Sequence, residues 1–96
     1  MSPYKFFLKC EDEGMSIKAG ILLDMISLYK EIPITEVMQN SLKLGLASPA
    51  TTHRDLHWLI DNHYIRCHES PLDKRIKLCN ISSKGRKFLS WYLMWK

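Results

Sequence analysis

No stretch of this sequence approaches the roughly 20 consecutive apolar residues of a membrane span. The sequence also has no G-x-S-x-G nucleophile motif, no glycine-rich phosphate loop and no convincing pair of catalytic carboxylates. Internal repeats, linkers and low-complexity segments are absent as well. These absences argue against a membrane-spanning protein and against an enzyme, and they predict no cofactor.

Cysteine is scarce and does not occur in a recognisable motif. Cys10, Cys67 and Cys79 are odd in number, form no C-x-x-C pair and follow no secretory signal. We therefore expect a reducing, cytoplasmic location. Cys67 and Cys79 fall on the two strands of one expected hairpin, where we interpret them as small apolar packing residues; a disulfide or a redox switch is the alternative.

The histidines do not predict a metal site. His53 and His57 have the i, i+4 spacing of two zinc ligands on a helix, but Arg54 stands where a zinc protease has its glutamate. No third ligand has a recognisable spacing, because His63 and His68 are isolated. We expect no bound metal.

The chain has room for a single domain over residues 1–96. Charge is distributed unevenly along it. Residues 1–47 contain five Lys or Arg against six Asp or Glu, and residues 48–96 contain nine against four. Cations that neutralise phosphates release condensed counterions, so the basic second half favours a polyanion as partner. A solvated basic face without a partner is the alternative.

Helical spacing of apolar residues dominates the first half. Ser16 is a good N-cap for a helix over residues 17–29, whose apolar positions form one broad stripe. A shorter helix is expected over residues 35–44, and Gly45 suits a left-handed turn. Residues 1–15 fit either a short helix or an extended arm.

The most informative run begins at Ser48. Ser48 and Pro49 supply an N-cap hydroxyl and a first-turn proline for a helix over residues 50–62. Within it, Leu56 and Leu59 share one apolar face at helical spacing. We expect this helix to pack against the two that precede it.

A charged hairpin and a final helix follow. A strand begins at Tyr64, residues 70–75 form a turn with three successive charges, and residues 76–81 return as a second strand. Ser82 or Ser83 then caps the last helix. This order is that of a winged helix-turn-helix, in which one helix enters the DNA major groove and the hairpin lies beside it. The predicted fold is mainly α with a small β-hairpin wing.

The hairpin resembles the wing of the MarR family of bacterial transcription regulators. The family pattern is Asp, any residue, Arg, a short strand and Leu-Thr-x-x-Gly. It is matched here by Asp73-Lys74-Arg75, the strand of residues 76–81 and Ser82-Ser83-Lys84-Gly85, with Ile81 and Ser82 in place of Leu and Thr.

The resemblance extends over about residues 14–90. Residues 48–54 are similar to the start of the family's recognition helix, and Leu59 with Tyr64-Ile65 matches its Leu and Leu-Ile positions. The chain departs from the family where His63 replaces the usual glycine at the end of that helix. It also lacks most of the long terminal helices that build the family's dimer.

The outer face of the helix over residues 50–62 is expected to contact DNA, because Thr52 points inward with the two leucines. Arg54 can form a fork with guanine O6 and N7, and Thr51 can offer a hydroxyl to a base or a phosphate. The helix start can face a phosphate. The predicted contacts from this helix are Ser48, Ala50, Thr51, His53, Arg54 and His57.

The resemblance implies that Arg75 reaches the minor groove, where a narrow A·T tract concentrates negative potential. Asp73 would orient this arginine through an ion pair, and Lys74 and Lys77 would add phosphate contacts. These four residues complete the predicted DNA-binding set.

The last helix, within residues 83–96, is apolar nearly all round. A helix without a polar face needs cover on more than one side. We therefore expect it to form a homodimer interface through Phe88, Trp91, Tyr92 and Trp95. Folding back over the chain's own core is the alternative.

Together these features predict a small transcription regulator that binds a roughly palindromic double-stranded DNA site as a homodimer. The main alternative is a winged-helix protein-interaction module that joins a larger complex through its aromatic tail. A replication or partition accessory protein of a plasmid or phage is a further alternative. Salt-dependent binding to duplex DNA separates the interaction module from the other two.

Overall fold

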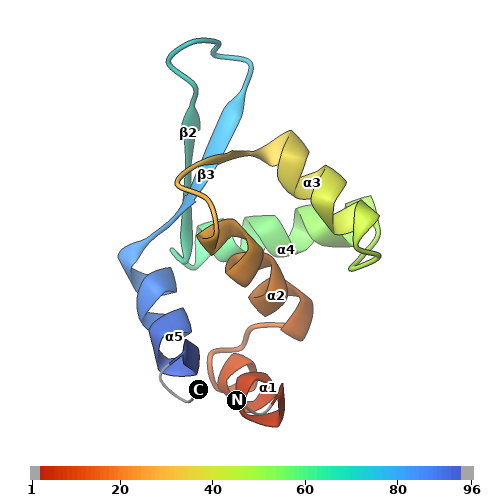
Figure 1. Cartoon of the computed structure of the whole chain (residues 1–96), viewed down its shortest axis with the longest axis vertical. Helices are drawn as coiled ribbons and strands as arrows, with labels where there is room; N and C mark the ends of the chain where they lie inside the picture. The colour runs from red at the N-terminus through yellow and green to blue at the C-terminus, as the bar shows by residue number, and fades with distance from the viewer. Residues whose placement is uncertain (1–2, 94–96) are drawn as a thin grey trace.

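Five helices and three short strands follow one another along residues 3–93, the part of the chain that the computed structural model describes. In chain order they are α1 (Pro3–Asp12), α2 (Ile17–Ser27), β1 (Ile32–Pro33), α3 (Ile34–Lys43), α4 (Pro49–Asp61), β2 (Ile65–Glu69), β3 (Lys77–Ile81) and α5 (Ser83–Leu93). Figure 1 shows the β2–β3 hairpin projecting from one end of the molecule and α1 and α5 at the other end. The winged helix-turn-helix prediction is confirmed, and the open choice between a short helix and an extended arm is decided in favour of a helix over Pro3–Asp12.

Serine side chains begin three of the helices. The hydroxyls of Ser16, Ser48 and Ser82 each accept a hydrogen bond from the backbone N–H three residues further on, at 3.1, 3.2 and 3.1 Å respectively. Each bond satisfies an N–H group that the first helical turn leaves without a partner. The caps of α2 and α4 are as predicted, and Ser82, rather than Ser83, caps α5.

Helices α3 and α4 each end in the same type of hydrogen-bonded turn. After α4, the N–H of Tyr64 donates to the carbonyl of Leu59 at 2.9 Å, and the N–H of His63 donates to Ile60 at 3.0 Å. This is a Schellman motif with His63 at its left-handed position, where φ is 66°. Gly45 has the same place after α3, also with φ of 66°, which confirms the predicted left-handed turn.

The three strands form one antiparallel sheet in the order β1-β3-β2. Cys79 on the central strand β3 is paired with Cys67 on β2 and with Ile32 on β1. The sequence did not predict β1, because two residues are too short to show an alternating pattern. This strand forms only because β3 lies beside it in the folded chain and pairs with it.

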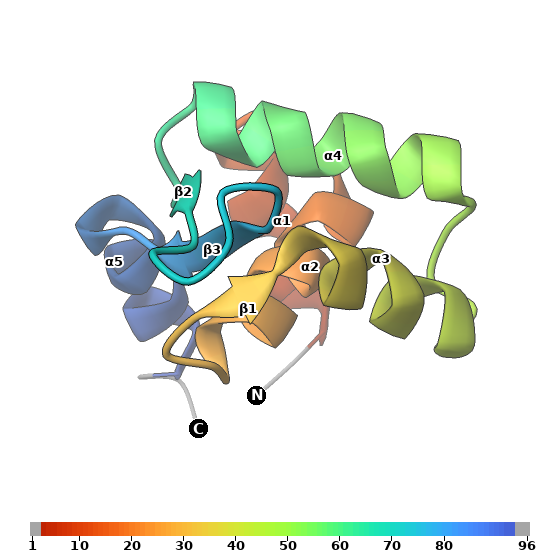
Figure 2. The same cartoon turned by 90° about the horizontal axis from the view of Figure 1, so that it is seen from above.

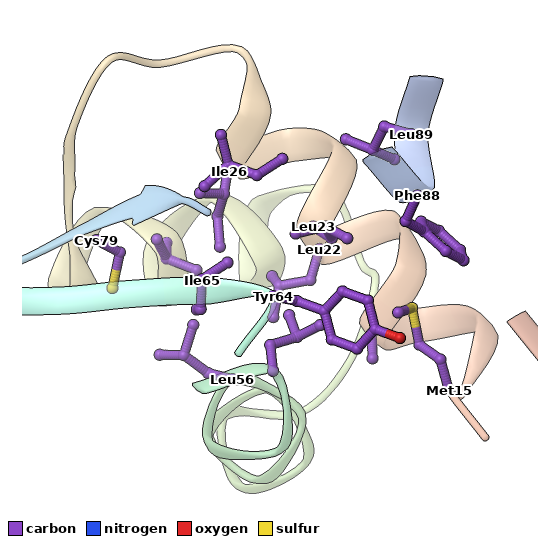
Figure 3. Packing of buried hydrophobic residues seen from close by; sticks show 14 of the residues in the cluster. Met15, Leu22, Leu23, Ile26, Leu56, Tyr64, Ile65, Cys79, Phe88 and Leu89 are labelled. Atoms are coloured by element: carbon purple, nitrogen blue, oxygen red, sulfur yellow. The ribbon is translucent and has the colours of Figure 1, made fainter. Parts of the chain in front are cut away.

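Helix α2 lies at the centre of the core. Leu22, Leu23 and Ile26 are at most 1% exposed, and Figure 3 shows them facing residues of α4, the sheet and α5. Burying aliphatic side chains of this size provides most of the driving force for folding. The helix-turn-helix pair and the hairpin are thus assembled around one helix that does not itself belong to that pair.

The position of Phe88 corrects one part of the expected dimer interface. Phe88 is only 4% exposed, and its ring centroid lies 6.0 Å from that of Tyr64 and 6.2 Å from that of Phe6. It therefore packs inside its own chain. The side chains of Trp91 and Tyr92, and all of Trp95, lie outside what the structure describes.

No helix within residues 3–93 is both long enough and apolar enough to cross a bilayer.

Candidate nucleic-acid interface

Helix α4 has a buried face and an exposed face, as predicted. Thr52, Leu56 and Leu59 are 2%, 1% and 0% exposed, and they attach the helix to α2 and α3. Figure 2 shows α4 running along one edge of the molecule. The outer face carries the predicted residues: Ser48, Ala50, His53, Arg54 and His57 are exposed, and Thr51 is half-buried.

The sequence did not predict the part played by Asp55. Its carboxylate is buried beside the outer face of α4, and Oδ1 lies 3.8 Å from Nε of Arg54. The Ser16 hydroxyl donates to the same oxygen at 3.5 Å. Asp55 thus connects the start of α2 to the base of the Arg54 side chain, which is 75% exposed.

His53 and His57 form a pair on the surface of α4. Their Nε2 atoms are 3.2 Å apart and their ring centroids 4.3 Å apart. A hydrogen bond of this kind needs a proton on one Nε2 and a lone pair on the other. Within residues 3–93 no group of three or more metal-ligating side chains is present, so this pair is not part of a larger cluster.

The tip of the wing is organised by Asp73. The Arg75 side chain donates from Nε to Oδ1 and from Nη2 to Oδ2, each at 3.1 Å. The backbone N–H of Arg75 donates to Oδ1 at 2.9 Å. These bonds hold the pKa of Asp73 below its usual value, because they favour the ionised carboxylate. The ion pair expected from the sequence is present.

The wing tip is cationic and open to solvent. Arg75 is 91% exposed although its guanidinium is held in place, and Lys74 and Lys77 are exposed on either side of it. Leu72 at the same tip is 96% exposed. Leu72 is not among the residues predicted from the sequence, where a single apolar residue within a charged turn is its only signal.

The base of the wing is joined to both flanking helices. The Ser82 hydroxyl donates to the carbonyl of Tyr64 at 2.8 Å. Lys84 donates from Nζ to the carbonyl of Asn62 at 2.9 Å, and the same Nζ lies 4.4 Å from the centre of the Tyr64 ring. Gly85 packs so closely against Tyr64 and Ile81 that a side chain has no room there. Residues 82–85 of the family-like pattern therefore hold α4, the wing and α5 together.

Several solved structures have the same arrangement. FabT from Streptococcus pneumoniae, in complex with DNA, has a TM-score of 0.70 and 23% identity, covering 84% of this chain and 54% of that one. A mutant of MarR from E. coli complexed with operator DNA has a TM-score of 0.72 and 16% identity, covering 90% and 59%. For a mutant of MepR from S. aureus bound to an oligodeoxyribonucleotide, the TM-score is 0.76, the identity 17% and the coverage 91% and 62%.

The chain has the MarR-type winged-helix fold. This confirms the fold expected from the residues around the wing, although no family model and no curated protein matches the chain. The MarR-type fold places α4 as the second helix of the helix-turn-helix and β2–β3 as the wing. The chain spans 54% to 62% of the length of these three neighbours.

Proposed function

We propose that this protein is a transcription regulator that binds double-stranded DNA with α4 in the major groove and the wing in the minor groove. The observation that carries the proposal is the state of Arg75. Its side chain is 91% exposed, and yet the guanidinium donates two hydrogen bonds to Asp73, with a third from the Arg75 backbone N–H. Ordering a long exposed side chain costs conformational entropy, and an ordered donor loses less on binding an external acceptor.

Each exposed residue of α4 makes a different contact with DNA in this proposal. Arg54 forms a fork with a guanine, Ala50 contacts a thymine methyl group, and Thr51 offers its hydroxyl to a base or phosphate. The capped start of the helix, at Ser48, faces a phosphate. His53 and His57 extend the same surface along the groove.

The structural neighbours support this proposal. The three neighbours described above are complexes with DNA, and a fourth, from Thermotoga maritima, is a transcriptional regulator. Such regulators are not enzymes, and the interface described here needs neither a cofactor nor a metal. Repression would follow from occupying a promoter in the cytoplasm and excluding polymerase.

The proposal includes a homodimer on a roughly palindromic site. Figure 1 shows α1 and α5 together at the end of the molecule opposite the wing. On α1, Tyr4, Phe7 and Leu8 are 67%, 43% and 38% exposed, an apolar surface that a second copy can cover. Deleting residues 90–96 should give a monomer with weaker DNA binding. Sedimentation of the intact protein as a monomer at micromolar concentration would contradict the dimer.

Two arginine substitutions test the DNA-binding proposal. The best site is first identified by selecting bound sequences from a random duplex pool. At that site Arg54→Ala should cost about 1–3 kcal/mol of binding free energy and relax the preference at one or two base pairs. Arg75→Ala should weaken binding to all sequences and reduce the salt dependence by about one charge. Affinities are measured for the best site and a scrambled duplex at two salt concentrations.

Lys87→Ala is the matched control, since it removes one exposed positive charge from α5, far from the wing. It should change the affinities for the best site and for the scrambled duplex only slightly, through the loss of one distant charge. If Arg54→Ala and Arg75→Ala behave like Lys87→Ala in folded protein, DNA is not the ligand of these residues. The protein-interaction alternative would then take its place.

A further inference from the structure

We propose that Cys67 and Cys79 form a reversible oxidation site within the wing, in which a hydroperoxide oxidises Cys67 and Cys79 then closes a disulfide across the hairpin. This chemistry does not depend on DNA binding. It replaces our interpretation of the two residues as inert packing groups, because the structure brings them into direct contact.

The register places the two cysteines where strands approach most closely. At the base of the hairpin the N–H of Ser82 donates to the carbonyl of Tyr64 at 3.0 Å, which makes these two residues a hydrogen-bonded pair. Hydrogen-bonded and non-hydrogen-bonded pairs alternate along an antiparallel ladder. Cys67 and Cys79 are three pairs further on, so they form a non-hydrogen-bonded pair. The backbone bond at the turn end of the hairpin gives the same alternation.

This position suits a disulfide. Cα atoms of a non-hydrogen-bonded pair are about 4.5 Å apart, within the range of roughly 4.4–6.8 Å that a disulfide spans. The two Sγ atoms of Cys67 and Cys79 already lie 2.7 Å apart, and both cysteines are free thiols. Bond formation therefore needs an approach of only ~0.7 Å, to the S–S length of about 2.05 Å.

The two thiols have different roles. Cys79 is completely buried, whereas Cys67 is half-buried and is therefore the more exposed of the two. A hydrogen bond from the Cys79 thiol lowers the pKa of Cys67 against the effect of burial, and the charge of Lys77 adds to the lowering. The same hydrogen bond and burial raise the pKa of Cys79. Cys67 is thus the thiolate that reacts first.

The reaction balances with hydrogen peroxide as oxidant. The Cys67 thiolate attacks one peroxide oxygen; the O–O bond breaks, an S–O bond forms, and the departing hydroxide takes a proton to leave as water. Cys79 sulfur then attacks the sulfur of the Cys67 sulfenic acid. The S–O bond breaks, and the hydroxyl leaves with the Cys79 proton as a second water. Two thiols and one peroxide become one disulfide and two waters.

The second step becomes easier once the first has occurred. The pKa of Cys79 is raised partly by its hydrogen bond to Cys67 and by the negative charge of Cys67. The negative charge disappears when the thiolate becomes a neutral sulfenic acid, and its hydrogen bond with Cys79 is weakened. The pair therefore contains an attacking thiol and a resolving thiol within bonding reach, and a small dithiol reductant would reverse the bond.

Cys10 provides an internal comparison in the same molecule. It is 1% exposed, and burial raises its pKa to about 11. In native, reduced protein we expect Cys67 to react with an alkylating agent at least about tenfold faster than Cys10. This measurement needs no substitution and is therefore independent of whether any variant folds.

The decisive experiment treats the reduced, folded protein with stoichiometric hydrogen peroxide, unfolds it in denaturant, blocks remaining thiols with N-ethylmaleimide and measures intact and peptide masses. We expect the loss of two hydrogen atoms, a Cys67–Cys79 cross-linked peptide and a single blocked thiol at Cys10. Cys79→Ser should instead accumulate a Cys67 sulfenic acid that dimedone traps, and Cys67→Ser should form neither product. Cys10→Ala, the control, should cross-link like the unaltered protein.

Three results would overturn the proposal. One is that both wing thiols remain blockable after peroxide treatment of folded protein. Another is that the cross-link joins two chains rather than two strands of one hairpin. The third is that Cys67 and Cys10 are alkylated at equal rates in the native protein.

Discussion

The hydroxyls of Ser41 on α3 and Thr52 on α4 lie 2.7 Å apart and form a hydrogen bond inside the core. Ser41 is 0% and Thr52 2% exposed, so neither hydroxyl can turn to water for a replacement partner. A buried polar pair is costly unless it is satisfied, and this bond requires Thr52 of α4 to face Ser41 of α3. This bond therefore helps determine which face of α4 points outward.

Removing either hydroxyl should destabilise the protein. Ser41→Ala or Thr52→Val leaves a buried hydroxyl without its partner, at a cost of about 1–3 kcal/mol in the free energy of unfolding. The double variant should cost less than the sum, because no unpaired hydroxyl remains. Denaturant unfolding of the four proteins measures this coupling. Ser90→Ala, on the surface of α5, is the control and should change the free energy of unfolding by less than about 0.5 kcal/mol. If the cost of the double variant equals the sum of the two single costs, the two hydroxyls are not coupled.

Asp73→Asn separates orientation from charge at the wing. The substitution makes the wing more positive, which by itself should strengthen DNA binding. It also removes the carboxylate that holds the Arg75 guanidinium, so we expect weaker binding to the preferred site. Glu69→Gln makes the same charge change on β2 without touching that pair and should strengthen binding slightly. If Asp73→Asn strengthens binding as much as Glu69→Gln does, Asp73 does not act by orienting Arg75.

The pH dependence of the wing follows from the lowered pKa of Asp73. A carboxyl whose pKa is lower in the folded state stabilises that state above its ordinary pKa and loses the contribution as pH falls through the folded value. Asp73 is thus ionised throughout the range from about pH 5 to pH 8. Two-dimensional NMR of the Arg75 Nε–H signal should show no Asp73 titration in that range and a change only in more acidic solution. A transition near neutral pH that Asp73→Asn abolishes would contradict this assignment.

Gly85→Ala should destabilise the protein although alanine is the better helix former. At an exposed helical site this exchange stabilises by up to about 1 kcal/mol. Here the new Cβ would collide with the backbone carbonyl of Tyr64 and the side chain of Ile81. We expect a net loss of about 1–3 kcal/mol, because well-packed cores resist added volume. Lys87→Ala on the same helix is the control for thermal unfolding; a stabilised Gly85→Ala variant would show that the contact is not tight.

His63 offers a test of the turn after α4. Its positive φ is unfavourable for residues with a Cβ, and more so for β-branched ones. His63→Gly should therefore be close to neutral, since relief of strain of about 1 kcal/mol is offset by the flexibility of glycine in the unfolded chain. His63→Val should cost at least about 1–2 kcal/mol. His57→Val, at ordinary helical backbone, is the matched control for unfolding, and equal costs at the two positions would contradict a left-handed turn.

Features that depend on near neighbours in the chain were determined by the sequence itself. The serine caps at Ser16 and Ser48, the turn at Gly45 and the pair of Asp73 with Arg75 each involve atoms a few residues apart. Hydrogen bonds of this range form wherever the local residue types allow them. The inward face of α4 belongs to the same class, because helical periodicity alone predicts it.

Only the tertiary structure decided the features that join distant segments. The pairing of Ile32 with Cys79, the hydroxyl bond between Ser41 and Thr52 and the burial of Phe88 all require segments to meet that share no local signal. The sequence placed Cys67 near Cys79 but left their distance open, because a shift of one residue in register sends a side chain to the opposite face of the sheet. Packing around α2 selects that register, and the contact between the two thiols follows from it.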